Sequence, residues 1–238
     1  MKGKREIDSG VSVIVSTNRP HYFERMIANF MRQTYEPKEL IVILNKDSMF
    51  LTKYQRKAAK YNASISVHQL PESTSLGYCL NYAINQARFP IISRFDDDDY
   101  YGARYLKSQL EGLKSSGADI VGKRACYAYL EASNKLILRY PKEQNCFVKQ
   151  IAGATFVCRK KLFRKIKFLN CTLGETVGWL RRSLAKGYKI YSTDCDHYVI
   201  MRRKNKASHT WRISDQKLMS QSKGIDHKTK RFHAYLFR

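Results

Sequence analysis

The sequence predicts an α/β protein with a Rossmann-like central sheet, mixed but mostly parallel, that is flanked by helices. Three observations predict this class. Short apolar, β-branched segments lack the alternation of half-exposed strands, as expected for strands buried on both faces of a parallel sheet. Segments with apolar residues at helical spacing alternate with them along the chain. The 238 residues, of which 43% are hydrophobic, suffice for one large domain with a sizeable core.

The first half of the chain carries the clearer pattern. Its first expected strand, residues 11–17, is nearly all apolar and leads into a polar turn. Each following strand is separated from the last by a helical pattern, which predicts right-handed crossovers between parallel strands. Further strands are expected at 40–44, 65–70 and 91–95, and helices at 22–31, 49–61, 76–87 and 105–113.

The second half is less regular, and neither an internal repeat nor a linker divides the chain. From Arg202 onward the sequence is basic and poor in aliphatic residues, which predicts an ordered flap or a partly mobile tail. Strand-like segments are expected at 119–121, 125–130, 136–139, 147–158, 189–192 and 198–201, and helices at 161–166 and 175–186.

The charge balance is strongly basic. Lys and Arg number 44 against 20 Asp and Glu, a formal net charge of +24. Such a surface attracts nucleic acid, anionic membranes, anionic polymers or phosphate-bearing substrates. The sequence has no helix-turn-helix, RNP-like or zinc-finger pattern, and its basic residues are dispersed, so no specific nucleic acid is expected. We interpret the charge as attraction to an anionic acceptor or an anionic membrane surface.

The six cysteines and the apolar segments indicate a location. No two cysteines form a C-x-x-C pair, and most lie in apolar stretches, which predicts buried free thiols rather than a zinc site. Residues 1–10 lack the apolar core of a secretory signal, and no apolar run approaches the length of a membrane span. A cytoplasmic protein is expected, with at most peripheral contact at the inner face of the membrane.

Four consecutive aspartates, Asp96 to Asp99, follow the buried strand expected at 91–95. In open α/β sheets, ligands bind beyond the carboxyl ends of the strands. Adjacent carboxylates repel each other unless a cation neutralises them, and oxygen ligands suit Mg²⁺ or Mn²⁺. The run therefore predicts a divalent metal site that also takes substrate phosphates; the alternative is a solvated acidic loop that caps the next helix.

Several further stretches occur in a definite order. The first is V-S-V-I-V-S-T-N-R-P, followed by a helix that ends in Arg32-Gln33-Thr34-Tyr35 and then by E-L-I-V-I-L-N. The second is Ser75-Leu-Gly-Tyr-Cys-Leu-Asn81, which precedes F-D-D-D-D-Y-Y. The third is Ile151-Ala-Gly-Ala-Thr-Phe-Val157 before an expected basic helix, and the fourth is Gly174-Glu175 with the helix that follows and then Gly187-Tyr-Lys-Ile-Tyr191. In order and spacing they resemble the family 2 glycosyltransferases, which have the GT-A fold. The resemblance covers about residues 11–203.

The resemblance implies a domain organisation. One GT-A domain would occupy residues 1–203, with a nucleotide-binding half at about 11–100 and an acceptor-binding half at about 101–203. The basic segment 204–238 would follow as a flap or tail. The acceptor would offer a hydroxyl; its identity is left open, with a glycan or an anionic polymer as candidates, and the basic charge is consistent with an anionic acceptor.

The resemblance also implies a nucleotide-sugar donor, with a UDP-sugar favoured. The second strand usually ends in an aspartate that hydrogen-bonds the base, whereas this chain has Asn45, with Asp47 as the alternative. An amide both donates and accepts, so it suits a uracil or guanine edge. The implied nucleotide-binding residues are Thr17, Asn18, Arg19, Asn45, Asp47, Asn81, Arg94, Asp96 and Asp97.

The metal ligands follow from the same resemblance. Asp96 and Asp98 match the D-x-D motif, so Asp98 is expected to bind Mn²⁺ or Mg²⁺ directly and Asp96 to share the metal or lie nearer the ribose. His209, after the last expected strand, is a further candidate ligand; its alternative is a surface histidine. Arg94, Arg202 and Arg203 are expected either at the donor diphosphate or as simple surface charge.

A second cluster, Asp194 to His197, resembles a metal site in composition. Alternation along a strand would send these side chains to opposite faces, so no site is expected there.

Glu175 matches the place of the family's catalytic carboxylate. The resemblance implies inversion by direct displacement, which needs one base to deprotonate the acceptor hydroxyl. The alternative is a helix-start preference, because carboxylates favour the positive end of a helix. A sugar nucleotidyltransferase is disfavoured because the turn at 18–20 lacks glycine. A catalytically degenerate GT-A protein and a basic binding protein for anionic polymers, membrane or nucleic acid remain as alternatives.

Overall fold

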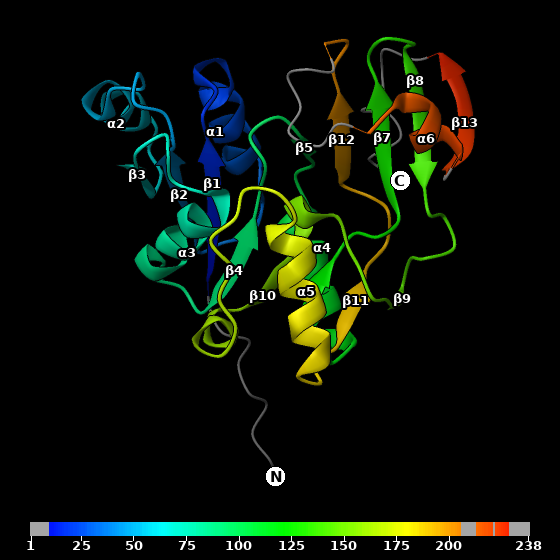
Figure 1. The fold of residues 1–238 in the computed structure, drawn as a ribbon. Coiled ribbons are helices and arrows are strands. Elements are labelled where there is room, and N and C mark those ends of the chain that lie inside the picture. Colours follow the sequence, from blue (N-terminus) through cyan, green and yellow to red (C-terminus); the bar gives the residue numbers. More distant parts are fainter. Residues whose placement is uncertain (1–9, 206–212, 221, 229–238) are drawn as a thin grey trace.

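The computed structural model describes residues 10–205, 213–220 and 222–228, which form two sheets side by side (Figure 1). The larger sheet has eight strands in the order β3-β2-β1-β4-β10-β6-β11-β9, and the smaller has five in the order β13-β8-β7-β12-β5. The predicted class, a mixed and mostly parallel sheet flanked by helices, is confirmed for the larger sheet.

Four parallel strands form one half of the larger sheet. They are β1 (Val11–Thr17), β2 (Lys38–Leu44), β3 (Ile65–Gln69) and β4 (Ile91–Arg94). Next to β4 lies β10 (Val157–Arg159), which is antiparallel both to β4 and to its other neighbour, β6 (Ile120–Gly122). Strand β6 pairs in parallel with β11 (Ile190–Ser192), and β9 (Cys146–Phe147) pairs antiparallel with β11 as the last strand of the sheet. The parallel strands therefore end together at one edge of the sheet.

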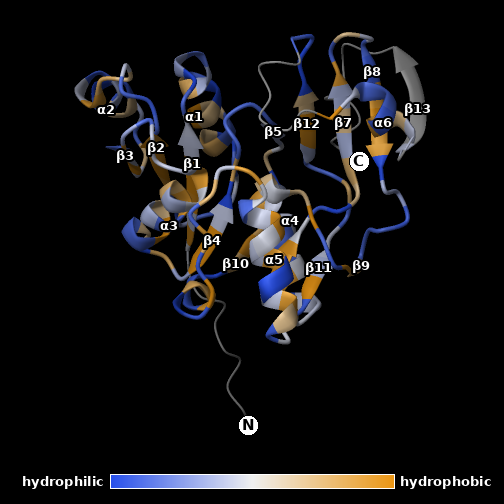
Figure 2. Ribbon diagram, viewed as in Figure 1, coloured by the Kyte–Doolittle hydropathy of each residue, from blue (hydrophilic) through white to orange (hydrophobic). Residues whose placement is uncertain are grey.

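Helices cover both faces of this sheet (Figures 1 and 2). Successive side chains of a strand point to opposite faces, so β1 serves two cores: Val13 and Val15 belong to one, and Ile14 to the other. The first core is covered by α1 (Phe23–Met31), α2 (Leu51–Ala58) and α4 (Tyr105–Ser115), and the second by α3 (Leu76–Gln86), the 3-10 segment Lys160–Arg164 and α5 (Glu175–Ala185).

The smaller sheet brings the chain's last described segments against its middle. It contains β5 (Tyr100–Tyr101), β7 (Cys126–Leu130), β8 (Lys135–Arg139), β12 (Tyr198–Arg202) and β13 (Ser222–Lys228). Within the basic segment that begins at 204, α6 (Asp215–Ser220) packs near β8, and β13 pairs antiparallel with β8. The structure thus describes part of this segment as one edge of a sheet.

Two expectations about local structure were wrong, and one strand was not predicted. The single strand expected at 147–158 is two short strands, because the chain leaves the sheet after Phe147 and makes a 3-10 turn at Gly153–Thr155. The basic helix expected at 161–166 is the 3-10 segment Lys160–Arg164. Strand β5 lies in what the sequence presents as a polar run, and its pairing with β12 comes from far along the chain.

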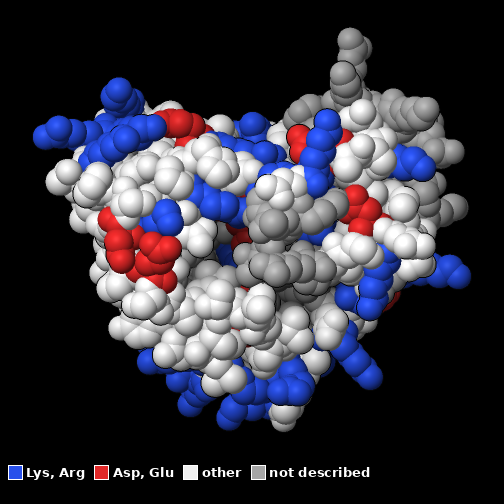
Figure 3. Space-filling model, turned by 45° about the horizontal axis from the view of Figure 1, so that its top comes forward, with Lys and Arg blue, Asp and Glu red and all other residues white. Residues whose placement is uncertain are grey.

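Two further observations bear on the sequence analysis. No disulfide joins the six cysteines; Cys79, Cys126, Cys158 and Cys195 are buried, and the other two are half-buried. Over the described residues, none of the helices is both long and apolar enough to span a bilayer. Lys and Arg side chains are spread widely over the surface in Figure 3.

Candidate active site

The acidic run lies where β4 leaves the sheet. After the last paired residue, Arg94, the backbone N–H of Phe95 still donates to Ile14 O over 3.0 Å. The ring of Phe95 stacks on Tyr101, with centroids 3.7 Å apart. The Tyr101 hydroxyl accepts from the Asp96 N–H and donates to Ala154 O, each over 2.8 Å. These contacts fix the turn that presents the four aspartates at the carboxyl edge of the sheet.

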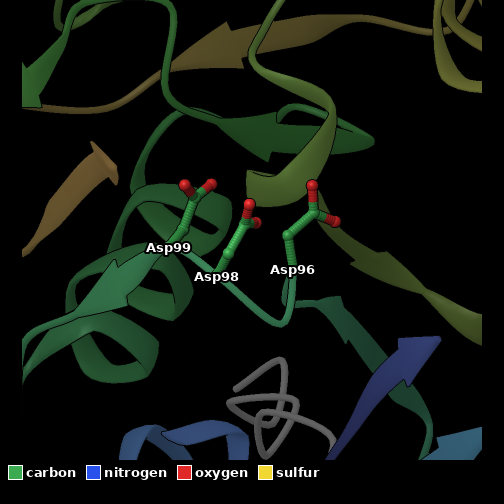
Figure 4. A group of neighbouring side chains, drawn as sticks. All are labelled: Asp96, Asp98 and Asp99. Atoms are coloured by element: carbon green, nitrogen blue, oxygen red, sulfur yellow. The ribbon is translucent and has the colours of Figure 1, made fainter. Parts of the chain in front are cut away.

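Three of the four carboxylates converge. Asp96, Asp98 and Asp99 each offer one oxygen, and these oxygens lie within 4.8 Å of one another. Figure 4 shows the three side chains next to one another and pointing the same way. Burial raises the pKa of Asp96 above its ordinary value, with Asp98 and Glu175 adding to the rise and Arg94 opposing it. Such a concentration of hard oxygen donors suits a divalent cation.

Asp97 points toward the end of β1 instead. Its Oδ2 accepts from the Thr17 hydroxyl over 2.6 Å and from Arg19 Nε over 3.0 Å. Burial and the neighbouring Asp98 raise the pKa of Asp97, while the hydrogen bonds from Arg19 and Thr17 lower it. The structure therefore brings together Thr17, Arg19 and Asp97, three residues predicted for the nucleotide pocket. Asn18, between the first two, is exposed.

Asp98 carries two arginines. Arg19 Nη1 and Arg203 Nη1 lie 3.0 and 2.8 Å from its Oδ2. The guanidinium carbons of Arg19 and Arg203 lie over the ring of Tyr22, 4.8 and 5.1 Å from its centroid. Arg203 thus stands at the acidic run, and a contact with the donor diphosphate stays a prediction. Arg202 turns elsewhere and donates to Ile213 O.

Asp99 is the member of the cluster that the D-x-D pattern did not single out. Tyr198 Oη donates to its Oδ2 over 2.5 Å, and the Met201 N–H donates to its Oδ1 over 3.1 Å. Burial, followed by Asp98 and Asp96, raises the pKa of Asp99 well above its ordinary value. Both oxygens are therefore held by β12, and only the uninterrupted run of four acids signalled this residue in the sequence.

Arg94 connects the acidic run with Glu175. Its Nη2 lies 2.9 Å from Asp96 Oδ1, and its Nη1 donates to Glu175 Oε1 over 2.9 Å and to Thr176 Oγ1 over 2.7 Å. Burial would lower the pKa of Arg94, but Asp96 and Glu175 together raise it above its ordinary value. Because the Arg94 side chain is only 7% exposed, it is a buried guanidinium shared by two carboxylates rather than surface charge.

Glu175 opens α5. The preceding residue, Gly174, has φ +77°, a left-handed conformation that favours glycine and turns the chain into the helix. The Thr176 hydroxyl also donates to Glu175 Oε1, over 3.0 Å. Within the described part of the chain, both contacts fall on Oε1 and none is recorded on Oε2. The local turn therefore aims the carboxylate inward, toward the end of β4.

The remaining predicted residues are placed as follows. Asn45 Nδ2 donates to Pro71 O over 2.7 Å, and Asp47 Oδ1 accepts from the Glu72 N–H over 3.0 Å, so both hold the turn after β3. Asn81 exchanges hydrogen bonds with the backbone of Phe168 and is not brought together with the aspartates. His209 lies outside the described residues.

The expectation that strand alternation separates the side chains of Asp194 to His197 was wrong, because these residues form a turn between β11 and β12. Asp194 Oδ1 accepts from the buried Lys123 Nζ over 2.8 Å. Among the described residues, the only group of three potential ligands found is that of the acidic run.

Comparisons with known proteins bear on the fold and the family of this chain. O-antigen biosynthesis glycosyltransferase WbnJ of Escherichia coli is 25% identical over 169 residues, which are 70% of this chain and 60% of WbnJ. The structure resembles S. aureus TarS 1–349 in complex with UDP-GlcNAc (TM-score 0.63, 17% identity, 89% of this chain and 64% of that one). It also resembles mannosyltransferase PcManGT from Pyrobaculum calidifontis in complex with GDP-Man and Mn²⁺ (TM-score 0.67, 19% identity, 89% and 62%).

These likenesses confirm the GT-A fold, and the chain spans less than two thirds of the length of each of these proteins. The model of the family described as "Glycosyl transferase family 2" matches residues 12–204, from the first strand of the parallel sheet to just past Arg203 at the acidic run. The matched region includes both the aspartate cluster and Glu175, and the chain therefore belongs to glycosyl transferase family 2.

Proposed function

We propose that this chain is an inverting glycosyltransferase that moves a sugar from a nucleotide diphosphate sugar to an acceptor hydroxyl. The observation that carries the proposal is the cluster of Asp96, Asp98 and Asp99, joined through buried Arg94 to Glu175. A site for an anionic leaving group and a candidate base thus adjoin each other at the carboxyl edge of one sheet.

The cluster fits a divalent metal, because three carboxylate oxygens approach one another in a part of the chain where burial disfavours their charge. Asp98 and Asp96, which match the D-x-D motif, would hold Mn²⁺ or Mg²⁺, while both oxygens of Asp99 accept hydrogen bonds from β12. When bound, the metal would supply positive charge that stabilises the departing diphosphate. His209 stays a further candidate ligand.

The donor nucleotide would lie against the ends of β1 and β2. Thr17, Arg19 and Asp97 already form one hydrogen-bonded group there, and Asn45 and Asp47 stand at the end of the neighbouring strand. The guanidinium forks of Arg19 and Arg203, now on Asp98, are the groups best shaped for a diphosphate. UDP is our preferred nucleotide, supported by the structures of TarS with UDP-GlcNAc and with UDP.

Glu175 would act as the base. Arg94 and Thr176 hold its Oε1, which leaves Oε2 to take the proton of the acceptor hydroxyl. As the acceptor oxygen forms its bond to the anomeric carbon, the bond from that carbon to the diphosphate oxygen breaks, and the nucleoside diphosphate leaves with the electron pair. Attack from the side opposite the leaving group inverts the carbon.

A thermal-shift screen of UDP, GDP, CDP, ADP and dTDP, each with and without Mn²⁺ or Mg²⁺, tests the donor and the metal together. A ligand that binds only the folded chain at about 100 times its Kd adds about 2.7 kcal/mol to the stability. For a chain of this length we expect UDP with metal to raise Tm by roughly 5 °C. If none of the nucleotides raises Tm, with or without metal, the donor site is rejected and a catalytically degenerate protein is favoured.

A further inference from the structure

One face of the larger sheet is basic almost without exception. It is formed by α3, the 3-10 segment Lys160–Arg164 and α5, whose apolar residues share one core. Helix α3 has no charged residue, and residues 155–189 contain ten Lys and Arg against one acid, Glu175. Because Glu175 is 8% exposed and pairs with Arg94, it adds little negative charge to the surface. We call α3 and residues 155–189 the basic face.

A cavity of about 830 Å³ opens on the basic face. Six cationic side chains line it, and no acid does; they are Arg88, Arg159, Lys160, Lys161, Arg164 and Lys167. Its apolar wall includes Ile84, Phe89 and Phe163. In the part of the chain that the structure describes, no carboxylate lies within ion-pair distance of Lys161, Arg164 or Lys167. The cavity therefore combines a strong positive field with apolar surface, which suits the phosphate headgroup and upper chain of an anionic lipid.

Exposed apolar side chains stand beside this cavity. Leu169 and Leu173, in the segment that leads into α5, are 55% and 68% exposed, and Val177 and Tyr78 are about equally so, at 53% and 50%. The segment is fastened to α3, since the Gly77 N–H donates to Cys171 O over 3.0 Å and Asn81, in the cavity wall, bonds Phe168. Exposed apolar groups among lysines and arginines are typical of surfaces that bind a lipid interface.

We propose that the basic face docks on an anionic lipid bilayer, with Lys161, Arg164 and Lys167 at the headgroups and Leu169 and Leu173 inserted among them. An anionic polymer would need the charges but would gain nothing from the exposed leucines, so the bilayer fits both observations. Figure 3 shows Lys and Arg along the lower edge of the molecule, as well as in other groups on the surface. The proposal goes beyond the proposed function and needs neither nucleotide nor metal.

Vesicle co-sedimentation tests the proposal. Vesicles of phosphatidylglycerol and phosphatidylcholine should bind the full chain at low salt, whereas vesicles of phosphatidylcholine alone should not. The triple variant Lys161→Glu, Arg164→Glu, Lys167→Glu should bind at least about 100-fold more weakly, since each basic residue contributes about fivefold near such a surface. About 0.5 M salt should release the unmodified chain.

The matched control reverses three exposed charges on α2 and in the turn that follows it, on the opposite face: Lys53→Glu, Arg56→Glu, Lys60→Glu. It has the same net charge as the test variant and should keep most of the binding. Equal weakening in the two variants would overturn the proposal, because net charge and not the basic face would then set the affinity. Failure of the unmodified chain to bind anionic vesicles would also overturn it.

A second pair of measurements separates bilayer from polymer. Leu169→Ser with Leu173→Ser should weaken binding to anionic vesicles by about 10-fold, because apolar area is no longer buried, while binding to polyphosphate stays unchanged. Binding to polyphosphate without binding to vesicles would reject the bilayer. The thermal-shift response to nucleotide and metal is read independently, so failure here is distinguishable from failure of the proposed function.

Discussion

Arg94 and Glu175 form a buried ion pair, with Arg94 Nη1 2.9 Å from Glu175 Oε1, although 81 residues separate them in the chain. The same guanidinium lies 2.9 Å from Asp96 Oδ1. One cation thus holds both the candidate base and a candidate metal ligand. Since the side chains of Arg94 and Glu175 are 7% and 10% exposed, water cannot replace the partner that either of them would lose.

Removal of Arg94 should be strongly destabilising. Arg94→Met leaves two carboxylates without their cation, and breaking a buried pair from one side costs about 3–5 kcal/mol. Urea unfolding followed by circular dichroism measures the loss. Arg56→Met, on the exposed side of α2, is the control and should change the stability by less than about 0.5 kcal/mol. Equal stability of both variants would show that the pair does not hold the site together.

Glu175→Gln should separate binding from transfer. The amide keeps the size of the side chain and cannot take up the proton, so transfer of the sugar to the acceptor, measured as acceptor-dependent release of nucleoside diphosphate, should fall at least about 100-fold. The metal-dependent affinity for nucleotide should stay within about twofold, because the base acts only in the transition state. The surface variant Glu111→Gln should match the unmodified chain in both assays. Retention of about half of the turnover would reject Glu175 as the base.

Asp98→Asn tests the metal assignment. The substitution removes one charge from the cluster while Asp96 and Asp99 remain, and Mn²⁺-dependent nucleotide binding should weaken at least about 10-fold. Calorimetric titration of nucleotide with and without Mn²⁺ gives the change directly. The control, Asp119→Asn, lies just before β6 at the opposite edge of the sheet. An unchanged affinity of Asp98→Asn would sink the assignment of this residue as a ligand.

Local patterns predicted most of this structure, and long-range pairing was what they missed. Strands β1 to β4 and helices α1 to α4 follow from hydrophobic periodicity, which a short window of sequence contains. Strand β5 does not, because Tyr100–Tyr101 becomes a strand only by pairing with Tyr198 and Val199. Local patterning also predicts one strand at 147–158 where the structure has β9 and β10, because residues 151–157 remain mostly apolar through the 3-10 turn between them.

In the candidate site, too, the sequence predicts local features and misses contacts between residues far apart in the chain. The acidic run and the residue types around it were readable, and the family is confirmed, while the roles of single residues stay predictions. For Arg94 the sequence allows both a diphosphate contact and simple surface charge, because nothing near it in the sequence indicates its bond to Glu175. The hold of Tyr198 on Asp99 likewise joins residues 99 positions apart. Such contacts follow from the packing of the two sheets.

Glu39 should make stability depend on acid. Burial alone would raise its pKa, but hydrogen bonds from the Ser12 hydroxyl and from the backbone and side chain of Arg88 outweigh it and lower the pKa below the ordinary 4.5. A lowered folded pKa means that this contribution is complete above about pH 4.5 and is lost as the pH falls through the folded value.

Glu39→Gln should therefore reduce stability at pH 7 by about 1.5–3 kcal/mol and flatten the fall below pH 4.5. Urea unfolding at a series of pH values between neutral and acid checks both effects. Glu111→Gln should retain the full acid dependence. Parallel stability curves for Glu39→Gln and the unmodified chain would show that this carboxylate does not contribute to it.

Two helical glycines should respond in opposite directions to alanine. A Cβ on Gly77 would lie 1.9 Å from Leu169 O, so α3 and the segment that carries Leu169 must separate, at a cost of about 1–3 kcal/mol. A Cβ on Gly178 meets nothing within 4 Å, so Gly178→Ala should stabilise α5 by about 0.5–1 kcal/mol. Urea unfolding gives both values. A stabilising Gly77→Ala would show that the segment that carries Leu169 does not pack on α3 as described. Because this segment is part of the basic face, Gly77→Ala should also weaken binding to anionic vesicles.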